Sequence, residues 1–255
     1  MLGPLYESLK AQVRQMPLVH ADETSFRFKG ANSWMWVFVH LTGVVYRIAP
    51  TRGREVVREV LEGFEGTLVR DGWDPYNCVT TADMQLDLLH INRWIERGEV
   101  LHRVEPRPLL KVVEAKLTGP GHPPHEFLEF ANRLRGLLRE TVLWTEAHRN
   151  ASRRERRRTF PSARRALAHQ VLHPWRDSDA ARISKELWSK REIVFTFVRK
   201  SEVSRQNALA ENHIRQEVLY PKTSGGRRSW RGAWVRERLM TAYRTCRPRG
   251  INFVR

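Results

Sequence analysis

The sequence predicts an α/β fold in which a small mixed sheet is followed by a long, mostly helical region. Residues 17–50 contain three stretches rich in β-branched and aromatic residues, separated by short turn sequences, which is typical of an antiparallel meander. A helical pattern at 52–62 separates this meander from a fourth apolar stretch at 66–71. From about residue 84 onward, apolar residues recur with the period of α-helices.

The first predicted element is a helix over residues 4–16. Leu5, Leu9 and Val13 fall on one face of this helix, and Pro17 ends it. The predicted strands of the meander then cover 17–28, 33–41 and 43–50.

Within the second strand, Trp34 and Trp36 are two residues apart, so strand alternation places both on one face of the sheet. We therefore expect them to belong to the core rather than to a platform on which bases stack.

The helix predicted at 52–62 is a crossover connection. Gly63 and Gly66 bracket the chain between this helix and the fourth strand. A strand, a crossover helix and another strand place the fourth strand parallel to a member of the meander. Open sheets of this kind carry reactive groups at the carboxyl ends of their strands, and Asp71 lies at such an end.

The rest of the chain predicts helices. An amphipathic stretch covers 84–99, and a Pro/Gly-rich break at 118–124 precedes a long helix candidate at 126–149. The basic run at 149–158 is expected to be an exposed helix end or a linker. The last helices are separated by a Gly/Ser/Arg loop at 221–229. We expect four parts, namely an N-terminal helix (1–16), the first part of the core (17–98), a mostly helical insertion (99–180) and a C-terminal helical part of the core (181–255).

The length, composition and net charge limit the classes of protein to which the chain can belong. A chain of 255 residues can bury one core, or one core with an inserted subdomain. A hydrophobic content of 41% together with nine Trp excludes wholesale disorder. The formal net charge of +17 favours a polyanionic partner. Nucleic acid is the first candidate and an anionic membrane surface the second, and a solvated basic face is the alternative to both.

Cysteine usage and hydropathy point to the cytoplasm. Cys78 and Cys246 form no C-x-x-C pair, so neither a disulfide framework nor a zinc ribbon is indicated. The N-terminal residues lack the basic region and apolar core of a signal peptide, and no apolar stretch is long enough to span a membrane.

Three carboxylates carry the candidate chemistry. Asp22 and Asp71 lie on or just after strand-like stretches, and Glu211 lies in a helical stretch far downstream. Carboxylates are ligands that Mg²⁺ prefers, and two divalent ions can activate the attacking oxygen and stabilise the leaving oxygen in phosphoryl transfer. Taken singly, each acid has an ordinary alternative as a turn former or an exposed helix residue. Together, on a basic chain, they predict a metal-dependent nuclease or DNA strand transferase.

At this point the sequence resembles the bacterial insertion-sequence transposases of the IS sixty-six type, which are DDE enzymes with a ribonuclease H-like core. The resemblance begins at HADET and continues through WMWVF, the YRI and P-x-RG stretch, and F-x-G-x-L-V-x-DGW-x-x-Y. Further matches are RISKELWSKREIVFTFV, N-x-x-AE and the tail from KTSGGRRSWRGA to RG-x-N. They cover roughly residues 17–255, with a divergent middle.

The resemblance implies a mechanism and partners. Asp22, Asp71 and Glu211 would hold two Mg²⁺ or Mn²⁺ ions, one of which activates water to nick the transposon end, after which the freed 3′-hydroxyl attacks target DNA. The implied partners are transposon-end and target DNA, a separate DNA-end recognition module or accessory proteins, and further copies of the chain in an active homo-oligomer. No membrane is implied, and we expect a bacterial, nucleoid-associated protein.

The chain departs from the family pattern near the third acid. The family usually reads D-N-N-x-A-E-R, whereas Gln206, Ala208 and Asn212 stand here in place of its first acid, its second amide and its arginine. Asp87 also replaces a family cysteine. Two alternatives therefore stay open, a degenerate transposase remnant that binds DNA without cutting it and another ribonuclease H-like nuclease.

Candidate DNA contacts are polar or basic residues in matching or charge-rich segments. His90 could orient a substrate phosphate or instead pack as a helix histidine, and Arg93 follows it in the family pattern. The Gly/Ser/Arg loop at 221–229 could bind a phosphate through its backbone amides, or it could simply be a solvated basic loop. The full set is His90, Arg93, Arg153, Arg154, Arg156, Arg157, Arg158, Asn207, Lys222, Arg227 and Arg228.

Overall fold

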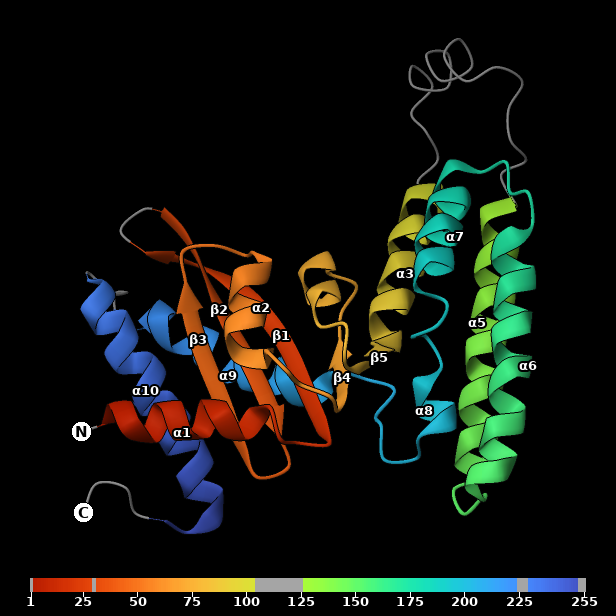
Figure 1. Cartoon of the computed structure of the whole chain (residues 1–255). Helices are drawn as coiled ribbons and strands as arrows, with labels where there is room; N and C mark the ends of the chain where they lie inside the picture. Colours follow the sequence, from red (N-terminus) through yellow and green to blue (C-terminus); the bar gives the residue numbers. More distant parts are fainter. Residues whose placement is uncertain (1, 29–30, 104–125, 224–228, 252–255) are drawn as a thin grey trace, which may run out of the picture. The chain divides into compact units, whose positions relative to one another are not determined.

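The computed structural model describes residues 2–28, 31–103, 126–223 and 229–251. The chain forms two compact units, and each is described by itself (Figure 1). The core unit comprises Met1–Asp87 and Val203–Arg255, and the helical unit comprises Leu88–Glu202. The helical unit is therefore an insertion between two segments of the core unit.

The core unit is built on a five-stranded mixed sheet with the strand order β3-β2-β1-β4-β5. β1 pairs antiparallel with β2 and parallel with β4, β2 pairs antiparallel with β3, and β4 pairs parallel with β5. The strands are β1 (Leu18–Phe28), β2 (Ala31–His40), β3 (Gly43–Ala49), β4 (Thr67–Arg70) and β5 (Asp83–Leu86). The expected α/β, ribonuclease H-like fold class is confirmed.

The fifth strand corrects the sequence-based prediction, which assigned a helix from residue 84. Asp83–Leu86 instead pairs in parallel with β4, and the helix α3 begins at Leu88. A strand of four residues is too short to show its own periodicity, and its conformation depends on the neighbouring strand with which it pairs.

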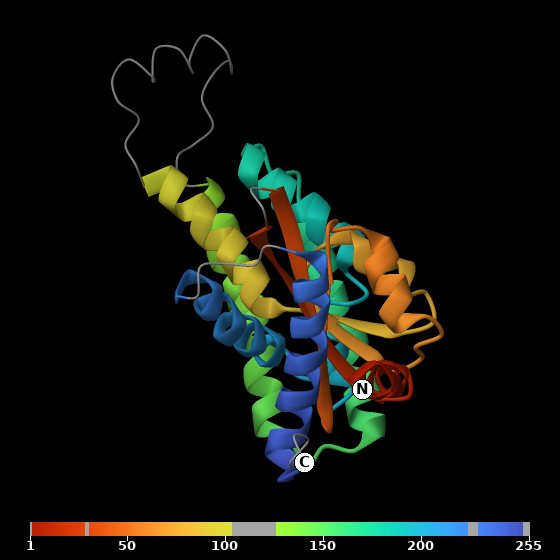
Figure 2. The same cartoon turned by 90° about the vertical axis from the view of Figure 1, so that its left-hand side faces the viewer.

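Helices cover both faces of the sheet (Figure 2). On one face, α1 (Leu2–Val13) and α2 (Arg54–Leu61) pack over a cluster that includes Trp36 and Phe38. On the other, α9 (Ala208–Thr223) and α10 (Trp230–Cys246) pack over Met35, Val37 and neighbouring apolar residues. Short 3₁₀ turns cover Asp74–Cys78 (η1) and Arg247–Arg249 (η2). Trp36 is fully buried and Trp34 packs against the same cluster, so both tryptophans contribute to the core as expected.

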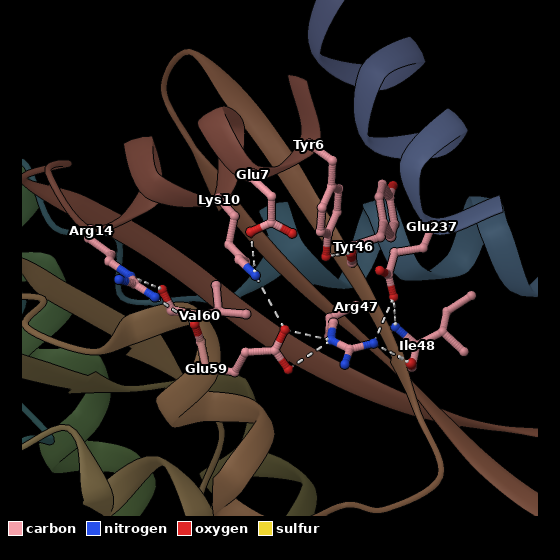
Figure 3. A network of polar contacts seen from close by, with 10 residues as sticks. All are labelled: Tyr6, Glu7, Lys10, Arg14, Tyr46, Arg47, Ile48, Glu59, Val60 and Glu237. Atoms are coloured by element: carbon pink, nitrogen blue, oxygen red, sulfur yellow. Dashed lines mark hydrogen bonds and ion pairs between the residues drawn. The ribbon is translucent and has the colours of Figure 1, made fainter. Parts of the chain in front are cut away.

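A polar network fastens α1, α2 and α10 to β3 (Figure 3). The Arg47 guanidinium donates to Glu59 at 3.0 Å and to Glu237 at 3.2 Å. Glu237 also accepts the backbone N–H of Ile48 at 2.6 Å, and Lys10 lies 3.3 Å from Glu59. Because Arg47 is shared between carboxylates of two helices, this network holds both helices to one strand.

The helical unit contains α3 (Leu88–Arg103), α5 (Glu126–Ala147), α6 (Arg153–Leu172), α7 (Ser178–Lys190) and α8 (Thr196–Arg199). Its buried residues include Phe127, Phe130, Leu134, Leu167 and Leu187.

The inserted unit is longer at both ends than the 99–180 expected from the sequence. It begins earlier because α3 runs without a break from Leu88 and packs on α5, and it ends later because α7 and α8 pack on α6. Across the described ranges, no helix is both long and apolar enough to cross a membrane.

Candidate carboxylate site

Asp22 lies on β1, and Asp71 directly follows the adjacent parallel strand β4. In the register between β1 and β4, His20 is opposite Val69. Asp22 and Asp71 each follow two residues later, where β4 has just ended. Parallel pairing therefore brings together two acids that are 49 positions apart in the chain.

Glu211 reaches the same region from α9. It lies in the first turn of this helix, whose buried residues Ala210 and Ile214 pack against the sheet. His20 points toward α9, because its Nδ1 lies 3.3 Å from Oδ1 of Asn207, just before the helix. Strand alternation gives Asp22 the same direction as His20. Asp22 and Glu211 therefore lie on one side of the sheet.

Asn207 fixes where α9 begins. Its side-chain amide donates to the carbonyl oxygen of Ala21 at 2.8 Å, and its backbone N–H donates to Asp87 at 3.3 Å. Its own carbonyl accepts the backbone N–H of Glu211 at 3.1 Å. Asn207 was predicted to be a DNA contact, but it is only 2% exposed and is an internal anchor that ties the third acid to β1.

The site concentrates negative charge. Burial, followed by the neighbouring carboxylates of Glu23, Asp71 and Glu211, raises the pKa of Asp22 to about 8, and a backbone hydrogen bond from Glu23 lowers it in part. The charges of Asp71 and Glu211 both act on Asp22, so the three acids singled out in the sequence share one electrostatic neighbourhood.

The donor chemistry of these acids suits a divalent cation. Carboxylate oxygens are hard ligands, and a cation between them would offset the repulsion that raises the pKa of Asp22. Among the residues that the structure describes, however, no three or more His, Cys, Asp or Glu side chains form a ready metal-binding group. The oxygen ligands therefore fit Mg²⁺ or Mn²⁺ in kind, although they do not form a closed cage.

Glu23 is next to Asp22 but is used differently. It accepts hydrogen bonds from Arg52 Nε at 2.8 Å and from the Tyr76 hydroxyl at 2.6 Å. Its side chain is completely buried, and alternation directs it away from the face that Asp22 shares with α9. This network was not among the features predicted from the sequence. The signal was available, because Glu23, Arg52 and Tyr76 all lie within motifs that carry the family resemblance.

The turn that carries Asp71 is held from within by Arg70. Arg70 is buried, and its guanidinium donates to the carbonyl oxygens of Asp71 at 2.9 Å and Trp73 at 3.3 Å and to the Asn77 side chain at 2.6 Å. The Asp71 carboxylate accepts the backbone N–H of Trp73 at 2.9 Å. The buried Arg70 guanidinium thus holds the backbone of the turn, and the backbone N–H of Trp73 in this turn orients the Asp71 carboxylate.

The basic run on α6 divides into exposed and buried members. Arg153, Arg154, Arg157 and Arg158 are exposed. Arg156 is 4% exposed and donates to the carbonyl oxygens of His148 and Arg149 at 3.0 and 2.9 Å, which holds the turn between α5 and α6. Its Nη2 is therefore bonded to backbone carbonyls inside the helical unit and does not face solvent.

The remaining candidate DNA contacts are spread over both units. His90 and Arg93 are half-buried on α3 in the helical unit, where the rings of His90 and Trp94 are nearly perpendicular and their centres are 5.3 Å apart. Arg227 and Arg228 lie outside the described residues, as does the side chain of Lys222.

Comparison with known proteins identifies the family. The model of the family described as Transposase IS66 family matches residues 1–234, a range that includes all three carboxylates. Neither the search of curated proteins nor the search of solved structures gives a match. Because the family match covers most of the chain, the protein belongs to the IS66 family of transposases.

Proposed function

We propose that this chain is the catalytic part of a DDE transposase, which cleaves DNA strands and transfers them in a metal-dependent reaction through Asp22, Asp71 and Glu211. The observation that carries the proposal is the pairing of β1 with β4, which brings Asp22 and Asp71 to neighbouring positions, with Glu211 acting electrostatically on Asp22. Membership of a transposase family supports a role in DNA processing.

Each acid would hold its place through a different part of the fold. Asp22 is carried by a central strand, Asp71 by a turn braced by Arg70, and Glu211 by a helix anchored through Asn207. Divalent ions bound by these acids would supply Lewis-acid activation of the attacking oxygen and stabilisation of the leaving oxygen. Because burial and the neighbouring carboxylates raise the pKa of Asp22, a bound cation would favour its ionised form and so promote loss of its proton.

The outer face of α6 is proposed to contact the DNA backbone. Arg154, Arg158 and Arg165 fall on the side of the helix opposite its buried residues, such as Ala163 and Leu167. At about 1.5 Å per residue, the first and last of these arginines are about 16 Å apart along the helix axis. A row of this length suits several phosphates of one duplex, and arginine is well matched to phosphate geometry.

Salt dependence tests this contact. Replacing the three arginines by alanine is expected to reduce the slope of log K against log salt by about 3 for a duplex without the terminal repeat. The control removes the same charge elsewhere in the helical unit, at the exposed residues Arg133, Arg176 and Arg182. Equal losses in both variants would mean that overall charge, and not this face, binds the duplex. Binding to anionic vesicles but not to DNA would point to a membrane instead.

A two-substrate assay tests the catalytic proposal. The protein is given Mn²⁺ with a labelled duplex that carries the element's terminal inverted repeat, and separately with an RNA–DNA hybrid. We expect nicking of the duplex that is abolished in Asp71→Ala and retained in Asp74→Asn, which changes an exposed acid of the same loop. Tight, salt-sensitive binding without nicking would instead identify a degenerate remnant, and cleavage of the hybrid alone would identify a different nuclease.

A further inference from the structure

Arg52 occupies a central position beside the turn that carries Asp71. It lies between β3 and α2, and its guanidinium carbon is 4.7 Å from the centre of the Trp34 ring and 3.9 Å from that of the Trp73 ring. Planar guanidinium groups stack on aromatic faces, so two rings restrict its movement. The Arg52 side chain is nevertheless 31% exposed, so the stack of Arg52 with Trp34 and Trp73 lies at the surface of the core unit.

One edge of the Arg52 guanidinium is committed to Glu23. Its Nε and Nη2 both donate to Oε1 of Glu23, while the Tyr76 hydroxyl donates to Oε2 at 2.6 Å. Both carboxylate oxygens of Glu23 therefore accept hydrogen bonds, and Arg52 supplies the opposite charge. Glu23 itself lies on the face of β1 opposite to that of Asp22. Without Arg52, a buried carboxylate would be left without its cation directly beside the candidate site.

Arg52 is linked to Asp71 through Trp73. The carbonyl oxygen of Arg52 accepts the indole N–H of Trp73 at 3.3 Å, and the Arg52 guanidinium stacks on the face of the same ring. The backbone N–H of Trp73 in turn donates to the Asp71 carboxylate at 2.9 Å. One residue thus holds both the edge and the face of the indole whose backbone orients the second acid.

We propose that Arg52 is a positioning residue for the carboxylate site, an inference that rests on the proposed function. Through Trp73 it sets the direction of the Asp71 carboxylate, and through Glu23 it keeps the adjacent acid out of the cation-binding set. Arg70 and Arg52 have different roles at this turn. Arg70 bonds to the backbone of the turn, whereas Arg52 holds the side chain of Trp73.

Mn²⁺ binding to the full chain tests the proposal without requiring turnover. Arg52→Gln removes the charge, and Arg52→Lys keeps the charge but loses the planar stacking group. We expect both variants to bind Mn²⁺ about 10- to 100-fold more weakly than the wild type, as is usual when a residue supporting metal ligands is removed. In the nicking assay, kcat is expected to fall while the KM for DNA stays unchanged.

Arg14→Gln is the matched control. Arg14 is also half-buried in the core unit, and it donates two hydrogen bonds to the backbone carbonyls of Glu59 and Val60 at the end of α2. Its loss should lower the melting temperature without weakening Mn²⁺ binding. Trp73→Phe keeps an aromatic ring but removes the indole N–H, and a several-fold loss of Mn²⁺ affinity is expected even if the Arg52 variants do not fold.

The outcomes separate this inference from the proposed function. Wild-type Mn²⁺ affinity in the Arg52 and Trp73 variants, with binding lost in Asp71→Ala, would overturn the positioning role alone. An equal loss of affinity in Arg14→Gln would show a general structural effect and would also overturn it. Failure of the wild-type protein to bind Mn²⁺ and to nick DNA would overturn the proposed function and the positioning role with it.

Discussion

Replacing Asp22 by asparagine should stabilise the metal-free protein, and the gain should grow with pH. Burial and neighbouring carboxylates raise the pKa of Asp22 from an ordinary 3.8 to about 8. Between these values the unfolded chain releases the proton while the folded chain keeps it, so the wild type loses stability as the pH rises. Asparagine has a similar shape and no titration, and it therefore avoids this loss.

The size of the effect follows from the pKa. At about 1.36 kcal/mol per pH unit, Asp22 costs the folded state roughly 2 kcal/mol at pH 5 and roughly 4 kcal/mol at pH 7. The advantage of Asp22→Asn should therefore increase by about 2–3 kcal/mol between these two values.

Urea unfolding followed by tryptophan fluorescence, in the presence of a chelator, measures this difference. The control is Glu65→Gln, which changes an exposed acid of the same unit and should give a constant difference from the wild type. A constant difference for Asp22→Asn as well would refute the reasoning, because it would mean that the site does not hold Asp22 in its protonated form.

Three further predictions concern packing and charge. Gly98→Ala should destabilise the helical unit by about 1–3 kcal/mol, because the added methyl would lie 2.0 Å from the Phe127 ring, whereas Gly136→Ala meets nothing within 4 Å and should stabilise it by up to about 1 kcal/mol, as thermal unfolding would show. Glu217→Gln should cost about 3–5 kcal/mol in urea unfolding, because it leaves two arginines of α10 without their shared buried carboxylate, and a loss below 1 kcal/mol would contradict this role. Burial and a nearby arginine lower the pKa of His40 to about 4, so stability should fall by up to about 3 kcal/mol as the pH drops from about 6.5 to 4, and the same titration of a His40→Gln variant should lack this decline.

The first four strands and the crossover helix could be predicted because each carries its own local signal. Alternating apolar residues and short turns define the meander, and the intervening helix predicts a parallel fourth strand that ends near Asp71. The fifth strand could not be predicted in this way, since Asp83–Leu86 is a strand only through its pairing with β4. Local pattern predicts long elements well, whereas a four-residue edge strand depends on its neighbour.

The direction in which a side chain points was the second feature that the sequence could not predict. In a run of five arginines, composition does not reveal that Arg156 turns inward to hold two carbonyl oxygens while its neighbours remain exposed. The same holds for Asp22 and Glu23, which alternate across the sheet. Sequence alone does not decide which of them faces α9, because this depends on which helices cover each face.

The sequence by itself determined the fold class and the family resemblance, because these follow from periodicity and motif order, and it predicted the chemical type of the candidate site from the placement of acids in a basic chain. Only the tertiary structure decided which acids share an electrostatic neighbourhood and what holds them. Asn207 bonds to Ala21 across 186 positions of the chain, and Arg52, in the connection between β3 and α2, bonds to Glu23 on β1. Such partners are brought together by strand register and helix packing, which are long-range properties that no local segment encodes.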